Sequence, residues 1–157
     1  MSGRLVGVLG GTGPAATAYF LQRLVERTEA RCDQDHVRTL AFNDTAIPDR
    51  TAFLLGRSDR SPLEALIEDG RLLEACGCDL LALPCNTAHA FVPYLERHLD
   101  IPFINMQIAT MEEIKAKLGD KARIGLLATS GTVQTGIYGD KAKALNLPMF
   151  VPDELHQ

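Results

Sequence analysis

Short apolar runs alternate along this chain with stretches in which apolar residues recur every three or four positions. The short runs predict buried parallel strands, and the spaced pattern predicts amphipathic helices. The expected strands are 6–9, 37–42, 80–83 and 101–104, and the expected helices are 14–31, 62–76, 91–99 and 108–118. Strands that alternate with helices through short connections are typical of parallel βαβ units with helices on both faces of the sheet. The predicted fold class is therefore α/β.

The chain also repeats itself. Residues 6–17 and 124–135 each contain an apolar strand, a small hydroxyl-bearing turn and the start of a helix, at an offset of 118 positions. Such a repeat predicts two pseudo-symmetric Rossmann-like domains with parallel sheets flanked by helices. We expect residues 1–104 to form the first domain and residues 105–157 a partial, incomplete second one. The alternative is that any two strand-turn-helix units look alike.

Composition and charge argue against nucleic acid, a membrane and a metal ion as partners. The net charge is −4 without a basic cluster of the kind that tracks phosphates, so no nucleic-acid partner is expected. No apolar run is long enough to span a bilayer and residues 1–9 do not resemble a signal peptide, which predicts a cytoplasmic protein without a membrane partner. The four cysteines, Cys32, Cys76, Cys78 and Cys85, lack zinc-ribbon spacing, so no metal is expected. Gly77 is expected to end a helix, with Cys76 and Cys78 as packing residues.

The stretch Pro84-Cys85-Asn86-Thr87-Ala88-His89 carries the clearest chemistry. Cys85 follows the apolar run 80–83, at the carboxyl end of a strand, where open α/β sheets bind ligands. Asn86 and Thr87 are interpreted as the turn and N-cap of the next helix, whose N-terminus favours a thiolate. The alternative is that Cys85 is a small buried residue that closes the strand. The donors on Asn86 and Thr87 favour the functional interpretation.

Two further motifs follow predicted strands. The segment 11–16 formally matches the dinucleotide fingerprint G-x-G-x-x-A, but Asp44 lies too far along to be its acidic partner. The glycines are better suited to let backbone N–H groups approach a small anion such as a carboxylate. In the segment 48–51, Arg50 offers a planar fork for a carboxylate and Thr51 a hydroxyl. The alternative is a surface arginine paired with Asp49 or Asp44.

Four stretches, 10–17, 47–51, 84–89 and 126–132, resemble the cofactor-independent aspartate/glutamate racemases, in the order found in that family. The resemblance implies an amino acid held between two domains, a cysteine from each domain on opposite faces of its α-carbon, no cofactor and a homodimer. It implies Cys85 as an acid/base thiol, Asn86 and Thr87 as ligands of the α-amino acid, and Arg50 as ligand of the side-chain carboxylate. The expected substrate-binding residues are Gly11, Thr12, Arg50, Thr51, Asn86, Thr87, Ala88, Thr129 and Ser130.

The chain also departs from the family pattern. Its members carry a second cysteine in a Gly-Cys-Thr-Glu-type motif and a basic substrate ligand near their C-terminus, and neither is present in these 157 residues. A counterpart of Cys85 at the repeat offset would fall near position 203, so the chain is expected to be truncated. Thr12 stands where the family commonly has methionine. Cys32, Cys76 and Cys78 are not placed to substitute, which leaves racemase activity in doubt for this chain.

Two functions of other classes remain open at this point. The first is a cysteine hydrolase, with Cys85 as nucleophile and His89 or His36 as base. His89 is four residues on in a helix, which points it away from the sulfur. The second is a module that binds a carboxylate without catalysis.

Overall fold

The computed structural model describes residues 3–153. Residues 1–2 and 154–157, the latter part of the predicted second domain, lie outside the described residues. Four parallel strands form one sheet in the order β2-β1-β3-β4, and two further parallel strands form a second sheet. The strands are β1 (Leu5–Gly10), β2 (Arg38–Asn43), β3 (Leu80–Ala82), β4 (Phe103–Ile104), β5 (Ile124–Gly125) and β6 (Met149–Phe150). Parallel sheets with helices confirm the predicted α/β class.

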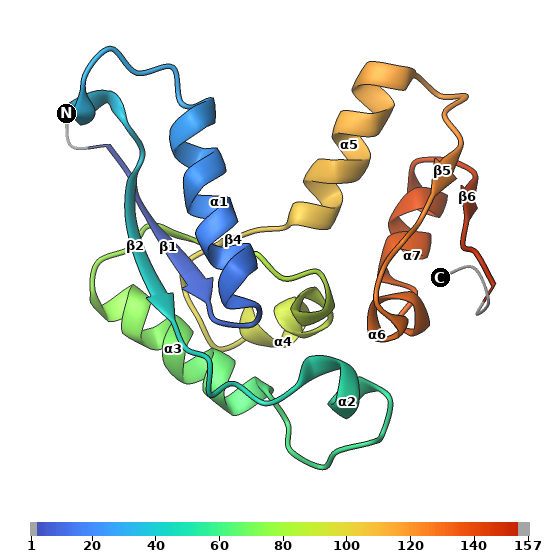
Figure 1. The fold of residues 1–157 in the computed structure, drawn as a ribbon, viewed down its shortest axis with the longest axis horizontal. Coiled ribbons are helices and arrows are strands. Elements are labelled where there is room, and N and C mark those ends of the chain that lie inside the picture. Colours follow the sequence, from blue (N-terminus) through green and yellow to red (C-terminus); the bar gives the residue numbers. More distant parts are fainter. Residues whose placement is uncertain (1–2, 154–157) are drawn as a thin grey trace.

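Helices connect these strands and form two lobes (Figure 1). The α-helices are α1 (Pro14–Arg27), α2 (Arg50–Leu54), α3 (Leu63–Ala75), α4 (Val92–Leu95), α5 (Met106–Leu118), α6 (Ser130–Gln134) and α7 (Ile137–Ala144). Two 3₁₀ helices, η1 (Asp33–Asp35) and η2 (Thr87–Phe91), complete the set. The first lobe contains the four-stranded sheet with α1 on one face and α3 on the other, and α5 leads from it to the second lobe. None of the helices within residues 3–153 is long and apolar enough to cross a membrane.

Each lobe has its own apolar core. In the first lobe, the face of the sheet toward α3 and α4 buries Leu9, Leu66, Leu73, Leu81 and Leu95. The opposite face, toward α1, buries a smaller set, Val6, Val8 and Ala82. In the second lobe, Met111, Ile124, Tyr138, Ala142 and Leu147 pack together. Each fully buried leucine of this kind contributes roughly 1.5–3 kcal/mol of transfer free energy, so the larger core holds the first sheet firmly.

The first helix ends earlier than its pattern predicts. The prediction extended it to Arg31, but α1 ends at Arg27, and Thr28 adopts an extended conformation with φ −83° and ψ 122°. The hydroxyl of Thr28 donates to the carbonyl of Leu24, which satisfies a carbonyl left free at the helix end. The chain then turns through η1 into β2.

The segment after Cys85 is also wrong in the sequence-based prediction. The expected single amphipathic helix is instead the 3₁₀ helix η2 followed by α4, which has four residues. Pro93 gives the physical reason, because it has no N–H to donate to the carbonyl of His89 and its ring disfavours a helix through this point. Asn86 occupies the N-cap position, but its side chain makes no capping hydrogen bond.

The corner between α3 and β3 follows its prediction in part. Gly77 has a φ of +83°, the left-handed conformation expected of the residue that ends a helix. Cys78 is buried in the core as expected, whereas Cys76 is exposed, which contradicts its expected packing role. The difference arises because Cys76 is the C-cap residue of α3, one step before the chain turns inward.

The sequence repeat corresponds to two similar local structures. In both copies a strand runs through a short turn into a helix, and β5 pairs with β6 in parallel as β1 pairs with β2. The second copy has a shorter strand, and its helix α6 begins at Ser130, which is two positions earlier in the repeat than Pro14 at the start of α1. The domain division after residue 104 stays a prediction.

Candidate active site

The turns after β1, β2 and β3 converge at one edge of the sheet, where the second lobe faces them across a cavity of about 490 Å³. This edge is the carboxyl end of the parallel strands, where α/β sheets bind ligands. The first lobe contributes Thr12, Ala16, Asp49, Arg50, Thr51, Pro84, Cys85, Asn86 and Thr87 to the lining, and the second contributes Leu127, Ala128, Thr129 and Thr132. The cavity therefore combines one thiol, one guanidinium, one carboxylate and several hydroxyls.

Most of the predicted site residues line this cavity. They are Thr12, Arg50, Thr51, Cys85, Asn86, Thr87 and Thr129. Thr132 and Asp49 also line the cavity but were not predicted, although they lie in the segments 126–132 and 48–51. Three predicted residues, Gly11, Ala88 and Ser130, do not line the cavity.

These three residues lie in different parts of the structure. Gly11 lies against the loop after β2, and an added Cβ there would come within 1.9 Å of the carbonyl oxygen of Asp44. Gly11 thus lets two loops approach closely, and its own N–H donates to Oγ1 of Thr17 at 3.1 Å and not to the cavity. Ala88 is fully buried in the core of the first lobe, and Ser130 is an exposed residue at the start of α6.

Cys85 lies at the turn after β3 and is half-buried. Its backbone N–H donates to the carbonyl of Leu83 at 2.8 Å, which bends the chain tightly as it leaves the sheet. Its side chain lines the cavity, whereas none of the other three cysteines does. Within the described residues the cavity therefore contains a single thiol, which can reach only one face of a bound ligand.

Arg50, at the first position of α2, is held before any ligand arrives. Its Nη1 donates to the carbonyls of Ile47 at 3.2 Å and Pro48 at 3.0 Å, and its Nη2 donates to the carbonyl of Thr12 at 2.9 Å. Its Nε is buried, and no atom within residues 3–153 accepts a hydrogen bond from it. A buried N–H without an acceptor is costly, so Arg50 keeps one donor that the described residues do not satisfy.

The predicted alternative, an arginine paired with a neighbouring aspartate, is not what the structure shows. Asp49 caps α2, and its carboxylate accepts from the backbone N–H of Ala52 at 3.0 Å. That hydrogen bond holds the pKa of Asp49 below its usual value. Asp44 accepts from the N–H of Ala46 in the same way. The charge of Arg50 is thus directed by main-chain carbonyls and stays available to a ligand.

Three threonine hydroxyls form a triangle where the two lobes meet. Thr87 of the first lobe lies 3.0 Å from Thr129 and 2.9 Å from Thr132, measured between Oγ1 atoms, and Thr129 and Thr132 are 3.1 Å apart. Each hydroxyl can donate to one neighbour and accept from the other, so the triangle satisfies all three. Next to it, the absence of a side chain on Gly131 lets α6 lie against Thr51 of α2.

His89 is committed to the backbone and does not face the thiol. Its Nε2 lies 3.2 Å from the backbone N of Met106, which can only donate, so Nε2 is the acceptor. Nδ1 therefore carries the proton and donates to the carbonyl of Cys85 at 2.8 Å. Burial lowers the pKa of His89 and keeps the ring neutral. Since His36 is not among the lining residues either, neither histidine named as base in the hydrolase alternative faces the sulfur.

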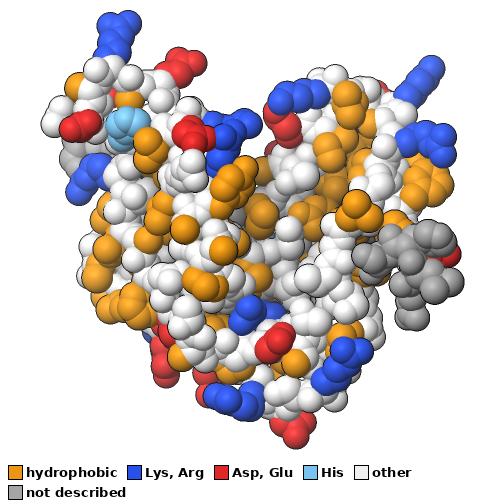
Figure 2. All heavy atoms as spheres, viewed as in Figure 1, with side chains coloured by type: hydrophobic (Ala, Val, Ile, Leu, Met, Phe, Trp, Pro, Cys, Tyr) orange, Lys and Arg blue, Asp and Glu red, His pale blue; other side chains and the backbone are white. Residues whose placement is uncertain are grey.

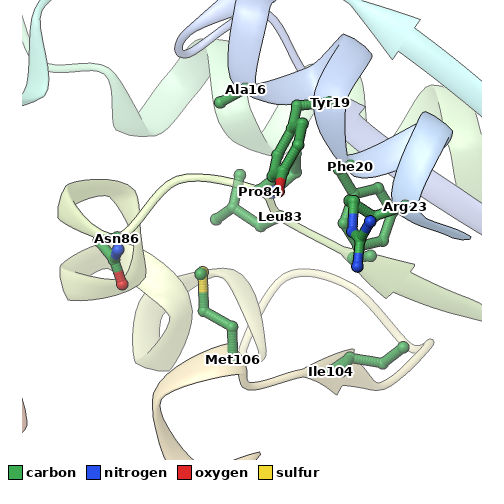
Figure 3. Close-up of a pocket in the computed structure, with 10 residues that line it drawn as sticks. Ala16, Tyr19, Phe20, Arg23, Leu83, Pro84, Asn86, Ile104 and Met106 are labelled. Atoms are coloured by element: carbon green, nitrogen blue, oxygen red, sulfur yellow. The ribbon is translucent and has the colours of Figure 1, made fainter. Parts of the chain in front are cut away.

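A second cavity of about 390 Å³ adjoins the first and shares Ala16, Pro84 and Asn86 with it. It opens into the notch between the two lobes, whose walls carry many hydrophobic side chains (Figure 2). Tyr19 and Phe20 from α1 face Met106 across this cavity (Figure 3). Arg23 also lines it but forms an ion pair with Glu26. The second cavity is thus apolar and offers no thiol.

Metal-ligand clusters are not found within residues 3–153, where no three histidine, cysteine or acidic side chains come close enough to hold an ion. The side chains that line the first cavity supply one thiol, one guanidinium, the carboxylate of Asp49 and hydroxyl or amide donors.

Comparison with known families places the chain in a class. Residues 9–157 match the Asp/Glu/hydantoin racemase family, and the chain belongs to that family. It is 30% identical over 140 residues to the broad specificity amino-acid racemase RacX of Bacillus subtilis, a match that covers 85% of this chain and 58% of RacX.

Solved structures give the same picture. Picrophilus torridus aspartate racemase matches with a TM-score of 0.84 and 37% identity, over 97% of this chain and 64% of that one. Aquifex pyrophilus glutamate racemase matches with a TM-score of 0.67 and 23% identity, over 94% and 53%, which shows the shared fold. The chain thus spans somewhat over half the length of these relatives.

Proposed function

We propose that this chain binds a small acidic amino acid, of the aspartate or glutamate type, and acts on its α-proton through Cys85. The observation that carries the proposal is the juxtaposition of the Cys85 thiol and the Arg50 guanidinium in one cavity. Family membership and the similarity to RacX and to aspartate racemase support the same reaction class. A homodimer and a cytoplasmic location are further parts of the proposal.

The roles follow from the chemistry of racemisation. The Cys85 thiolate removes the α-proton, and the electron pair left on the α-carbon is delocalised into the adjacent carboxylate. Arg50, which lines the cavity, binds the side-chain carboxylate through the positive charge of its guanidinium. Thr12, Thr51, Asn86, Thr87 and Thr129 supply the polar walls that hold the amino acid. Gly11, Ala88 and Ser130 do not line the cavity, so we assign them a structural role in the segments next to it.

A single thiol can return a proton only to the face from which it came. We therefore expect this chain to exchange the α-proton of one aspartate enantiomer with solvent, but not to interconvert enantiomers efficiently. In D₂O the proton on the Cys85 sulfur exchanges with solvent, and a deuteron then returns to the α-carbon.

Incubation with L- and D-aspartate in D₂O tests the proposal. Mass spectrometry reports deuterium uptake, and chiral chromatography reports inversion. We expect slow uptake into one enantiomer, loss of uptake in Cys85→Ser, and no change in Cys32→Ser, because Cys32 is exposed and outside the cavity. Equal uptake in the wild type and Cys85→Ser would remove Cys85 from the reaction. Tight binding without uptake would instead favour the non-catalytic carboxylate-binding module.

A further inference from the structure

Tyr138 of α7 reaches from the second lobe to Asn86 in the loop after β3. Its hydroxyl donates to Oδ1 of Asn86 at 2.5 Å, across 52 positions of sequence. The side chain is 6% exposed, and its ring packs in the core of the second lobe. Burial raises the pKa of Tyr138, so its hydroxyl stays protonated and remains a donor.

Asn86 is held at its main chain as well. Its carbonyl accepts from the backbone N–H of His89 at 3.1 Å and from Nε2 of Gln107 at 3.3 Å. Gln107 is 1% exposed, so this second contact is shielded from water. With the backbone fixed from two sides, the contact with Tyr138 decides how the side-chain amide is turned.

The orientation of that amide matters because Asn86 lines the candidate active-site cavity beside Cys85 and Thr87. Figure 3 shows Asn86 also at the border of the apolar cavity, so its amide stands between the two. Oδ1 is occupied by the hydroxyl of Tyr138, and Nδ2 donates to no other residue within 3–153. The amide therefore offers two N–H groups, and not an oxygen, to a ligand.

We propose that Tyr138 is a positioning residue, which holds the amide of Asn86 so that Nδ2 donates to a carboxylate oxygen of the bound amino acid. This inference rests on the proposed function, because it presumes an acidic ligand in the cavity. It assigns to the second lobe a part in ligand recognition beyond the hydroxyl that Thr129 brings to the cavity wall. Without the tyrosine hydroxyl the amide can rotate and present Oδ1, which repels a carboxylate.

The test is a double-mutant cycle measured by calorimetry with L-aspartate. Tyr138→Phe keeps the ring and its packing, and we expect it to weaken binding about three- to tenfold, the effect of one lost hydrogen bond. Asn86→Ala should weaken binding by at least as much. In the Asn86→Ala background, Tyr138→Phe should have no further effect. Tyr94→Phe is the matched control, since Tyr94 is 51% exposed and outside the cavity.

Two results would overturn the inference. One is wild-type affinity in Tyr138→Phe, and the other is an equal loss with and without Asn86, which would indicate a general structural effect. If the wild type does not bind aspartate, the proposed function fails, and the inference is then tested by NMR. The side-chain amide signals of Asn86, assigned by their loss in Asn86→Ala, should be rigid in the wild type and mobile in Tyr138→Phe. Equal rigidity in both proteins would refute the positioning role.

Discussion

The two lobes contribute different chemical groups to the candidate active site. The first presents the guanidinium from the loop after the six-residue strand β2 and the thiol from the loop after the three-residue strand β3, whereas the second presents hydroxyls from a helix that follows a two-residue strand. The core of the first lobe is also the larger of the two. The difference indicates that the reactive groups are placed on the lobe with the larger core, while the second lobe forms the opposite wall of the cavity.

The largest expected effects come from truncating one buried side chain in each core, and they should differ between the two lobes. Leu81 lies in β3 and is fully buried in the first core, and Met111 is 2% exposed in the second lobe. We expect Leu81→Ala to cost about 3 kcal/mol and to lower the main unfolding transition. Met111→Ala should instead reduce amide protection in α5 and α7 while residues 5–10 stay protected. Hydrogen exchange with mass spectrometry measures both.

Leu118→Ala is the control for this pair, because Leu118 is 68% exposed and its truncation should change stability by less than about 0.5 kcal/mol. If Met111→Ala exposes the first sheet as much as the second lobe, the two lobes unfold as one unit and the comparison breaks down.

The second effect concerns charge, which only the first lobe brings to the cavity. Arg50→Lys replaces a planar fork by a point charge and loses the geometry held by three carbonyls. We expect the affinity for aspartate to fall about tenfold or more, equivalent to roughly 1.4–2.8 kcal/mol, and the affinity for alanine to change much less. Calorimetry with both amino acids measures the difference. Equal losses would remove Arg50 from the carboxylate site.

The third effect concerns a buried carboxyl group that destabilises the first lobe at neutral pH. Asp69 of α3 is 8% exposed, and its Oδ2 accepts no hydrogen bond from any residue within 3–153. Burial, together with the charges of Asp44 and Glu68, raises its pKa to about 6 from 3.8. Because the folded state prefers the protonated acid, stability is lost as the pH rises from about 4 to about 6 and stays lost above that range.

Asp69→Asn removes this ionisation. We expect it to stabilise the protein by about 2 kcal/mol at pH 7 and by close to nothing below pH 4. Thermal unfolding at both pH values is the measurement, with the exposed Asp59→Asn as control. A gain that is the same at both pH values would show that packing, and not the charge of Asp69, is responsible.

The smallest effect tests the junction between the lobes. Thr132→Val keeps the shape of the side chain but removes one hydroxyl from the triangle with Thr87 and Thr129. We expect a cost of about 1 kcal/mol, because the remaining two hydroxyls can still pair. Thr87→Val combined with Thr132→Val should cost less than the sum of the single changes. Strict additivity in chemical denaturation would show that the hydroxyls do not act together.

Much of this arrangement could be predicted from sequence. The alternation of apolar runs and helical patterns predicted the parallel sheet, and the position of Cys85 after one such run placed it at the correct edge. Arg50 could be placed there for the same reason, since it follows the second strand. These inferences succeed because the carboxyl ends of parallel strands must lie together.

The remainder depends on tertiary contacts that leave no local signal. Nothing in the sequence indicates that Tyr138 reaches Asn86, because the two lie on different lobes. The short η2 and α4 could have been inferred from Pro93, but the apolar spacing of residues 91–99 outweighed it. The exposed position of Ser130 and the burial of Ala88 likewise follow from how the helices pack and not from their motifs.

The three carbonyls that hold Arg50 have a consequence for the thermodynamics of recognition. A free arginine side chain loses about 0.5–1.5 kcal/mol of rotamer entropy when a ligand immobilises it. Here folding has already immobilised the guanidinium. Carboxylate capture at this position should therefore be favoured mainly by enthalpy, with little ordering of the protein, and the heat released should depend on the ligand's anionic group more than on its length.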